Sequence, residues 1–376
     1  MIIKTQIKLF RDFIEDGRTS MEIYADGLGK ALRLNSEDNF QLKDFTPHTS
    51  NFITKTLGIN HSQMRIERYL HYPLQARKQQ GSVNHIIDHA YGHLLRFINP
   101  QTSIVTVHDM IPVLAYMKKI PGLTYPHLPA LFKFSLSSLS RARFIVAVSN
   151  STKKDLITYC GLEDEKVKVI YNGIGDIFTP FSSRKKEVLR KSFGFPDMGT
   201  HIVLITGSLG YKNHAASFKV IEILQQKTAK PVQLVVLKNA AIDLNIDVSE
   251  YSFNNPIIIL SGIDNNRLVE LYNAVDCLLF PSLYEGFGWP PLESMACGTP
   301  VVTSDIGPFP EIVGDAGLMQ SPYEPFKLAE AVLLLLENQE VRRLYIERGL
   351  KKAKEFTWER CANEFGKLYD DILEMK

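Results

Sequence analysis

Two acidic residues, Glu285 and Glu293, enclose the stretch EGFGWPPLE, which follows the apolar run DCLLF. Between them lie two glycines, two prolines and two aromatic residues. On one continuous helix the two carboxylates would be separated by about 12 Å of rise. Because Gly286 and Gly288 allow tight backbone geometry and a close approach of a ligand, we expect a turn that lets both carboxylates face one cavity.

The residues after this turn predict a helix that begins at Pro290 or Pro291 and stops at Gly298. Proline suits the first helical position and glycine the C-terminal stop, so Glu293 is expected in the first helical turn. Free N–H groups at that end and the helix dipole attract an anion. A glutamate in a first turn is also favoured electrostatically without any function, and this alternative stays open for Glu293.

A second loop suited to an anion follows the apolar strand HIVLITG. Gly207 and Gly210 precede Lys212 at the predicted start of a helix, which would place an ammonium group and backbone N–H donors against a phosphate. The loop has neither the Walker spacing nor the GxGxxG spacing. A surface lysine at a helix start is the plainer interpretation.

A histidine and an arginine complete the set of candidate side chains. His108 follows the apolar strand SIVTV, and the carboxyl end of a central strand is where a ligand is expected. The alternative for His108 is a core histidine bonded to the backbone. Gly17 and Arg18 lie in a glycine-containing loop ahead of a predicted helix, and we expect them to project from a strand end into the same cleft.

These side chains must be positioned by strands and helices that alternate along almost the whole chain. Short β-branched runs that are apolar on both faces are typical of parallel strands covered by helices. The intervening segments carry apolar residues at intervals of three and four, which indicates helices. The predicted strands are VNHII, SIVTVHD, RFIVAVS, VKVIYNG, HIVLITGS, PVQLVVLK, PIIILSG, DCLLF and PVVTS. The predicted helices are STKKDLITYCG, HAASFKVIEILQQK, NNRLVELYNA and the long stretch from Pro325 to Phe356.

Strict alternation of strands and helices predicts the α/β class with doubly wound sheets. The alternation breaks in a polar, basic segment near residues 173–198, which Pro180, Gly194 and Pro196 interrupt. This break divides the 376 residues into two halves of about equal size, in keeping with the length. Since ligands of such sheets bind at the carboxyl ends of the strands, we expect the site in a cleft between two facing domains.

The composition bounds the class of partner. The formal net charge is +2, which gives no reason to expect nucleic acid. Four widely separated cysteines and an N-terminus without a signal-peptide pattern predict a cytoplasmic protein, and no apolar stretch is long enough to span a membrane.

Basic residues gather in the first half, either as a solvated face or as a peripheral contact with anionic lipid or a lipid-linked substrate. They are Lys118, Lys119, Lys133, Arg141, Arg143, Lys153 and Lys154.

The segment PSLYEGFGWPPLESMACGTPVVTSDIGPFPEIVGDAGL resembles the signature of the retaining glycosyltransferases of family GT4, with its E-x7-E motif. AVSNSTKKDL with VKVIYNGI, and the loops TVHDMIP and ITGSLGYKNH, are similar to other motifs of that family and occur in the same order. The resemblance covers nearly the whole chain and implies the GT-B fold, an α/β fold of two doubly wound Rossmann-like domains facing across a cleft. The implied parts are an acceptor-side domain at 1–175, a linker at 176–198, a nucleotide-sugar domain at 199–355 and a helix at 356–376 that packs back on the first domain.

The resemblance also implies roles for the residues singled out above. Glu293 would bind the ribose hydroxyls of a sugar nucleotide. The expected catalytic residues are Glu285, which would contact the sugar near the reacting carbon, Lys212, which would neutralise the diphosphate, and His108, which would lie beneath the sugar. Further donor contacts would come from Gly207, Ser208, Gly286, Phe287, Gly288, Trp289 and, near the base, Ile263.

Two positions depart from the family pattern. Ser208 and Tyr211 stand near the place of an arginine that usually precedes the lysine, so Lys212 would carry the phosphate charge alone or with an unidentified partner. Gly17-Arg18 replaces the usual Gly-Gly pair, which leaves the acceptor contacts and any phosphate role of Arg18 open. A departing diphosphate needs positive potential and N–H donors. Without a DxD motif we expect no metal and no cofactor besides the sugar nucleotide.

The forms HDMIP and SLYEGFG are similar to the mannosyltransferase-like branch, so GDP-mannose is the first expected donor. UDP-linked sugars, or a deoxy sugar such as rhamnose, are the alternatives. The implied acceptor is a glycan or a lipid-linked sugar in the synthesis of a polysaccharide or glycoconjugate. A sugar-nucleotide epimerase of the same fold and a non-catalytic sugar-nucleotide-binding subunit are the competing hypotheses.

Overall fold

The chain folds into two compact units, which are described separately. The computed structural model describes residues 5–35, 40–47, 61–207, 210–238, 248 and 250–375, without the side chains of 61–63 and 183–184. Unit 1 comprises Met1–Val113, Pro126–Gly173 and Thr357–Lys376, and unit 2 comprises Leu114–Tyr125 and Ile174–Phe356. No helix in the described ranges is both long and apolar enough to cross a bilayer.

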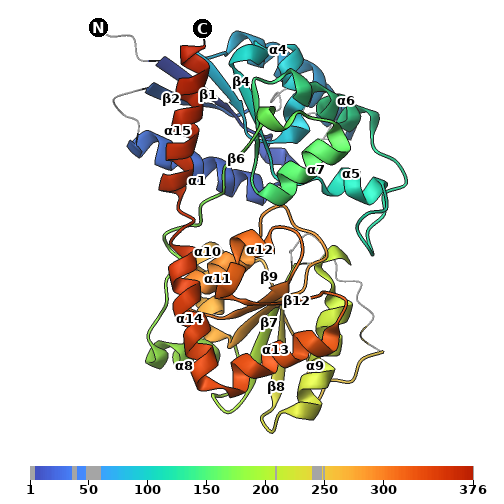
Figure 1. Ribbon diagram of the computed structural model, residues 1–376, viewed down its shortest axis with the longest axis vertical. Helices are drawn as coiled ribbons and strands as arrows, with labels where there is room; N and C mark the ends of the chain where they lie inside the picture. Colours follow the sequence, from blue (N-terminus) through green and yellow to red (C-terminus); the bar gives the residue numbers. More distant parts are fainter. Residues whose placement is uncertain are drawn as a thin grey trace. The chain divides into compact units, whose positions relative to one another are not determined.

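Unit 1 is built on a fully parallel sheet with the strand order β2-β1-β3-β4-β5-β6. Its strands are β1 (Thr5–Phe10), β2 (Phe40–Phe45), β3 (Val83–Ile86), β4 (Ser103–Val107), β5 (Phe144–Ala147) and β6 (Val167–Val169). Every residue of β3, β4 and β5 is buried, because helices cover the sheet, with α1 (Thr19–Asn35) and α15 (Trp358–Glu374) side by side (Figure 1). The other helices are α3 (His61–Ile66), α4 (Tyr72–Lys78), α6 (Ala130–Ser138) and α7 (Asn150–Cys160), while α5 (Ile111–Tyr116) crosses the division between the units. Short helical turns are η1 (Ile14–Asp16), η2 (Glu67–His71), η3 (His89–Arg96), η4 (Pro100–Thr102), η5 (Leu139–Arg141) and η6 (Asp164–Lys166).

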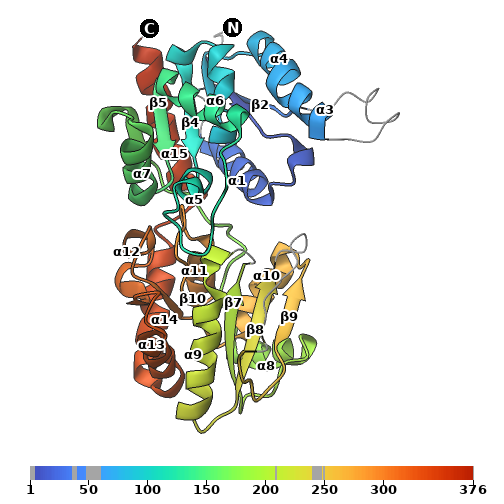
Figure 2. The ribbon, with the colours of Figure 1, turned by 90° about the vertical axis from the view of Figure 1, so that its right-hand side faces the viewer.

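Unit 2 repeats this plan with the strand order β12-β11-β10-β7-β8-β9, again fully parallel. Its strands are β7 (His201–Thr206), β8 (Val232–Lys238), β9 (Ile258–Ser261), β10 (Cys277–Phe280), β11 (Val301–Ser304) and β12 (Leu318–Gln320). Its helices are α8 (Ser183–Ser192), α9 (His214–Lys227), α10 (Asn265–Ala274), α11 (Trp289–Ala296), α12 (Phe309–Ile312), α13 (Pro325–Glu337) and α14 (Gln339–Ala353), with the turns η7 (Gly210–Lys212) and η8 (Gly314–Ala316). α9 packs against α13 and β8 (Figure 2), and α11 packs against both α10 and α14.

The core of unit 2 fills the space between its sheet and the helices α9 and α13. Val203 of β7, Leu279 of β10, Phe218 of α9 and Val332 of α13 are all buried there. β7 and β10 are buried along their whole length, as expected for central strands of a parallel sheet. The two parallel sheets with helices confirm the predicted α/β class of two Rossmann-like domains.

All of the predicted strands are present, but β1, β2 and β12 are not among them. β1 (TQIKLF) and β2 (FQLKDF) alternate polar with apolar residues, and β12 has only three residues, so none shows the continuous apolar run of the others. The long helical stretch from Pro325 is two helices. Asn338 separates them with φ −101° and ψ 103°, and its side chain caps α14 by accepting a hydrogen bond from the N–H of Val341 at 3.0 Å.

Two segments differ from the expected domain boundaries. The polar segment predicted as a linker, 176–198, contains α8, which packs on α10 in unit 2. Leu114–Tyr125, expected in the first domain, groups with unit 2. The backbones of Gly122 and Gly210 approach so closely there that a Cβ at Gly210 would lie 2.8 Å from the Gly122 carbonyl oxygen.

Candidate active site

The loop after β7 places Lys212 beside the end of β10. Gly207 has φ +98°, and a Cβ atom there would lie 2.7 Å from Lys212 Cγ, so glycine is needed for the lysine side chain to lie across this turn. Asn213 is left-handed, with φ 58°. Its Nδ2 donates to the carbonyl oxygens of Pro281 at 3.1 Å and Pro322 at 2.9 Å. These bonds tie the lysine loop to the chain that leaves β10 and β12.

An ion pair joins this loop to the loop after β10. Lys212 Nζ lies 2.6 Å from Glu285 Oε1, because β7 and β10 are neighbours and the carboxyl ends of parallel neighbours meet at one edge. Ser282 Oγ donates to the same Glu285 oxygen at 2.7 Å, and the ammonium lies 4.7 Å from the centre of the Phe280 ring. The Lys212 and Glu285 side chains are only 14% and 12% exposed, which strengthens their attraction.

Glu293 lies in the second turn of α11, so its expected place in the first turn is wrong. The helix begins at Trp289, ahead of both prolines, because Gly288 caps it with φ +107°. A Cβ at Gly288 would come within 3.2 Å of the Phe309 ring. Glu293 is then the fifth helical residue, and the electrostatic preference of a first turn does not account for it.

The Glu293 carboxylate is held by a tyrosine of the neighbouring helix. The hydroxyl of Tyr272, on α10, donates to Glu293 Oε2 at 3.0 Å. Burial raises the pKa of Glu293 to about 7, and the hydrogen bond from Tyr272 opposes that rise. The two acidic residues therefore have different partners, since Glu285 faces an ammonium group and Glu293 a neutral hydroxyl.

Phe287 and Trp289 lie between β10 and the first turn of α11. Phe287 is buried edge-on against Trp289 and Phe356, with ring-centre distances of 6.4 and 6.0 Å. Its side chain therefore belongs to the packing of unit 2, and its backbone is the part suited to a ligand. The predicted contacts of Phe287, Gly288 and Trp289 with a donor remain predictions.

Three further residues were predicted to contact the donor, namely Ser208, Gly286 and Ile263. Ser208 lies outside the described residues. Gly286 is buried in the turn after β10. Ile263 is half-buried and follows Gly262, which has φ +65°, at the end of the outer strand β9. A role of Ile263 near a base remains a prediction.

In unit 1, His108 directly follows β4 and is 8% exposed. Its Nε2 lies 2.8 Å from the carbonyl oxygen of Ile87, so this nitrogen carries the hydrogen. The Tyr24 ring packs edge-on at 4.6 Å. Burial lowers the pKa of His108, although the charge of Asp88 opposes this, so the ring is neutral at pH 7. These contacts match the alternative of a backbone-bonded core histidine, and a catalytic role remains a prediction.

Gly17 and Arg18 stand between η1 and α1, and the Arg18 side chain, 38% exposed, lies beside two buried aspartates. Arg18 forms an ion pair with Asp88 and lies 4.0 Å from Asp12. Burial and the neighbouring Asp88 raise the pKa of Asp12. Burial alone would also raise the pKa of Asp88, but Arg18 and His89 hold it well below its usual range. The two carboxyl groups therefore differ, because the pKa of Asp12 is raised above its usual range and that of Asp88 is lowered below it.

Four side chains of these sites are not among the predicted site residues. Asp12 follows β1, and a strand predicted there would have marked it as a strand-end carboxylate. Asp88 directly follows the predicted strand VNHII, so its position at a strand end was visible in the sequence. Ser282 and Tyr272 carry no local signal. Tyr272 reaches Glu293 only because α10 packs against α11.

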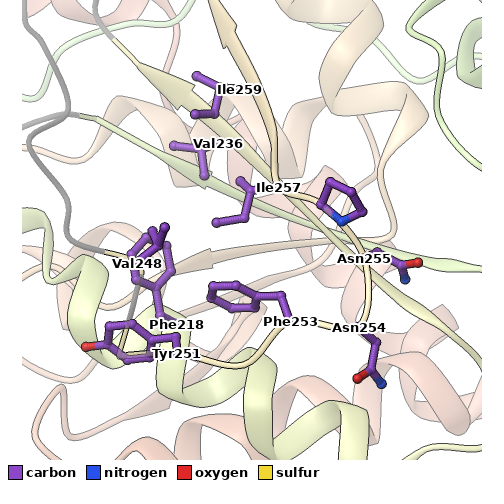
Figure 3. Close-up of a pocket in the computed structure, with 10 residues that line it drawn as sticks. Phe218, Val236, Val248, Tyr251, Phe253, Asn254, Asn255, Ile257 and Ile259 are labelled. Carbon is purple, nitrogen blue, oxygen red and sulfur yellow. The ribbon is translucent and has the colours of Figure 1, made fainter.

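A separate apolar cavity of about 630 Å³ lies elsewhere in unit 2, between α9, β8, β9 and the segment before β9 (Figure 3). Phe218, Tyr251 and Phe253 line it and pack on one another, with ring-centre distances from Phe218 of 5.2 and 5.7 Å. None of the predicted site residues is part of its lining. The strand-end loops with Lys212, Glu285 and Glu293, rather than this cavity, have the groups that chemistry requires.

Two family models match the chain in succession. Residues 53–176 match the model of Glycosyltransferase Family 4, and residues 185–352 match that of Glycosyl transferases group 1. The second match contains both acidic residues and Lys212.

Several curated proteins are similar in sequence. The serotype-specific mannosyltransferase WbdA of Escherichia coli is 25% identical over 271 residues, which is 70% of this chain and 33% of WbdA. The O-antigen chain mannosyltransferase B of Escherichia coli is 41% identical over 105 residues, 28% of either chain. The matched part of this chain thus covers about a third of the length of these two mannosyltransferases. A D-inositol 3-phosphate glycosyltransferase of Corynebacterium glutamicum is 26% identical over 241 residues, 61% of this chain and 57% of the relative.

Solved structures share the fold over nearly the whole chain. Sucrose-phosphate synthase from Thermosynechococcus elongatus superimposes with a TM-score of 0.76 at 19% identity, over 99% of this chain and 100% of that one. The Anabaena protein HepE, in complex with UDP and glucose, does so with a TM-score of 0.73 at 17% identity, over 98% and 100%. With two parallel-sheet units that superimpose on these structures, the protein has the GT-B fold, and its two halves match the models of Glycosyltransferase Family 4 and of Glycosyl transferases group 1.

Proposed function

We propose that this protein is a retaining hexosyltransferase. It would move a hexose, with mannose from GDP-mannose as the first choice, from a nucleoside-diphosphate sugar to a hydroxyl of a glycan or lipid-linked acceptor. The observation that carries the proposal is the Lys212–Glu285 ion pair, with its 2.6 Å contact at the carboxyl ends of two adjacent parallel strands. A ligand that is both anionic and rich in hydroxyl groups suits such a pair, because the ammonium attracts phosphate and the carboxylate accepts hydroxyl hydrogen bonds.

The chemistry follows from the charges of these groups. As the bond from the sugar carbon to the diphosphate oxygen breaks, negative charge grows on the leaving group. Lys212 and the N-terminal end of α11 would stabilise that charge. The acceptor oxygen would bond to the same face of the sugar, and its proton would pass to the departing diphosphate. Glu285 would orient the sugar and form no covalent bond to it.

The choice of mannose is supported by the relatives, two of which are named as mannosyltransferases. The complex of HepE with UDP and glucose supports UDP-glucose as the main competitor. We therefore propose a thermal-shift panel of GDP-, UDP-, ADP- and dTDP-sugars. Stabilisation by GDP-mannose alone would support the first choice, and stabilisation by a UDP-sugar alone would reassign the donor.

Product analysis separates the enzymatic alternatives. With donor and a mannoside acceptor, a retaining transferase yields a glycoside with the anomeric configuration of the donor, which NMR of the product reports. An epimerase would instead convert the sugar nucleotide without any acceptor. A non-catalytic binder would show a thermal shift but neither transfer nor slow hydrolysis of the donor. We expect transfer to survive removal of divalent cations with EDTA, because Lys212 and α11 supply the positive potential.

A cytoplasmic location with a peripheral membrane contact remains part of the proposal. Tyr116 and Met117 are 40% and 45% exposed and directly precede Lys118 and Lys119, which are also exposed. Apolar side chains beside cations suit an anionic lipid surface. Co-sedimentation with phosphatidylglycerol vesicles, weakened when both lysines are replaced by glutamate, would support this contact. Equal binding to neutral vesicles would count against it.

A further inference from the structure

Tyr272 fixes the carboxylate of Glu293 from behind. Its hydroxyl donates to Oε2 at 3.0 Å and, within the part of the chain that the structure describes, is the hydrogen-bond partner of that carboxylate. The Tyr272 side chain is 1% exposed, and its ring packs against Phe178 at 6.2 Å. Its carbonyl oxygen accepts a hydrogen bond from Thr299 Oγ1 at 2.6 Å. The tyrosine is thus a rigid support that engages one carboxylate oxygen and leaves the other to a ligand.

We propose that Tyr272 is a positioning residue that makes the site selective for ribonucleotides over 2′-deoxyribonucleotides. The inference rests on the proposed function and on the role that the family resemblance implies for Glu293, which would bind the ribose of the donor. A ribose presents two neighbouring hydroxyl groups, and a carboxylate accepts both only in one orientation. A side chain free to rotate would spend part of its time in orientations that accept one hydroxyl or none. With Oε2 held by Tyr272, the carboxylate is organised for the diol before the ligand arrives.

The surroundings of Glu293 make the hydrogen bond from Tyr272 important for the charge of the carboxylate. Within the residues that the structure describes, the titratable groups that interact with it are Tyr272 from α10 and Cys297 from the end of α11. Burial raises the pKa of both groups, so each is neutral at pH 7. No cation among them holds the carboxylate in its charged form, and the tyrosine hydroxyl is the group that favours ionisation. Loss of the hydroxyl would therefore affect both the orientation and the charge of Glu293.

The test compares a ribonucleotide with its deoxy analogue on the full-length protein. Calorimetry would measure the dissociation constants of GDP and 2′-dGDP, or of UDP and 2′-dUDP if the panel above selects uracil. We expect the wild type to bind the ribonucleotide at least tenfold more tightly. In Tyr272→Phe the ribonucleotide affinity should fall about tenfold, as for one lost hydrogen bond to a charged group, while the deoxynucleotide affinity stays the same. In the wild type, the preference for the ribonucleotide should rise between pH 6 and pH 8.5 as Glu293 loses its proton. In Tyr272→Phe this rise should occur at higher pH, because the hydrogen bond that favours the charged carboxylate is lost.

A matched control is Tyr369→Phe in unit 1. Tyr369 is fully buried, and its hydroxyl lies 2.8 Å from His85 Nδ1, so the same atom is removed from a comparable hydrogen bond far along the chain. This control should leave the ribose preference unchanged. In a Glu293→Gln background, Tyr272→Phe should have little further effect on the preference, because the two residues act through one hydrogen bond.

The outcomes separate this inference from the proposed function. If the wild type binds neither ribonucleotide, the proposed function fails. If it binds one of them, but without a preference over the deoxy analogue or with a preference that Tyr272→Phe leaves intact, the inference is overturned and the proposed function stands. An equal loss of affinity for both nucleotides in Tyr272→Phe would also overturn it, since that is the effect of a structural residue.

Discussion

Single residues decide the charge of the proposed site, and Lys212 is the clearest case. Its ammonium group is shared between Glu285 at 2.6 Å and the face of Phe280 at 4.7 Å. A bound diphosphate would compete with Glu285 for this cation and release the carboxylate toward the sugar. Gly207 makes the arrangement possible, since a Cβ there would overlap the aliphatic part of the lysine.

Replacing Lys212 with alanine should lower kcat by about 10²–10³-fold, because one preorganised group that stabilises the leaving charge is lost. The acceptor KM should change little. Lys219→Ala is the control, because Lys219 lies on α9, the helix that follows η7, but is 51% exposed and pairs with Glu222. Steady-state kinetics with both substrates would measure the effect. A parallel change in kcat and acceptor KM would argue against a leaving-group role.

Glu293 should make the unliganded protein less stable as the pH rises. The pKa of this carboxyl is about 7 in the folded state and about 4.3 in an unfolded chain, so the folded state binds more protons between these values. Stability then falls as the pH rises from about 5 to 8. Glu293→Gln removes this titration, and the variant should gain about 1–3 kcal/mol relative to the wild type over that range. Urea unfolding at pH 5 and pH 8 would show it, and a pH-independent difference would contradict it.

At the scale of elements, a buried carboxylate attaches α8 to the sheet of unit 2. Asp276, directly before β10, lies 2.9 Å from Lys186 Nζ and 2.5 Å from Arg190 Nη2 of α8, and accepts a hydrogen bond from the N–H of Ile202 at 2.9 Å. Burial disfavours its charge, but Lys186, Arg190 and Arg342 together hold the pKa of Asp276 well below its usual range. The basic segment that the sequence presents as a linker is therefore part of the packed unit.

Asp276→Asn should destabilise the protein by about 3 kcal/mol, because Arg190, 2% exposed, would be left buried without a counter-charge. The depressed pKa means that the contribution is present above about pH 4 and is lost as the pH falls further. The difference from the wild type should therefore shrink in acid. Asp315→Asn is the control, since Asp315 is 85% exposed and 3.8 Å from Arg348. Denaturation midpoints of both variants at pH 7 would test this, and similar small effects would refute it.

At the scale of the whole molecule, the chain ends in the unit in which it begins. α15 belongs to unit 1 and packs on α1, where Trp358 lies directly over Gly27. A Cβ at Gly27 would come within 2.2 Å of Trp358 Cε2. Farther along α15, Phe365 stacks on His85 of β3 at 4.7 Å. The last helix thus completes the hydrophobic core of the first unit.

Gly27→Ala should cost about 2 kcal/mol of stability, because the new methyl group overlaps a packed indole. Gly29→Ala, two residues along the same helix, should be neutral or stabilise by up to about 1 kcal/mol. Its Cβ would meet the movable end of Arg33 at 3.2 Å, and alanine favours a helix. In a Trp358→Leu background the cost of Gly27→Ala should decrease. Thermal unfolding of the four variants would measure it, and equal effects at positions 27 and 29 would contradict the contact.

The spacing of apolar residues and glycines in the sequence was enough to predict most of the strands, several helices and the turns that hold the candidate site. Continuous apolar runs such as DCLLF and HIVLITGS are strands, and stretches such as NNRLVELYNA are helices, because burial on one or both faces dictates the spacing of apolar residues. Glycines 207 and 288 mark the turns where only a residue without a Cβ fits. The strand-end positions of Lys212 and Glu285 follow from the same pattern. β1 and β2 alternate polar with apolar residues, so the pattern of continuous apolar runs does not predict them.

Tertiary structure alone decided which residues meet. The Lys212–Glu285 contact joins residues 73 positions apart and depends on β7 and β10 being neighbours in the sheet. Tyr272 contacts Glu293, and Arg18 contacts Asp88, because of how helices and strands pack. The sequence around these residues does not predict either contact. The pKa of Glu293 likewise depends on burial by segments distant in sequence. Spacing along a chain records periodic burial, whereas hydrogen bonds and shifted charges depend on which surfaces are packed together.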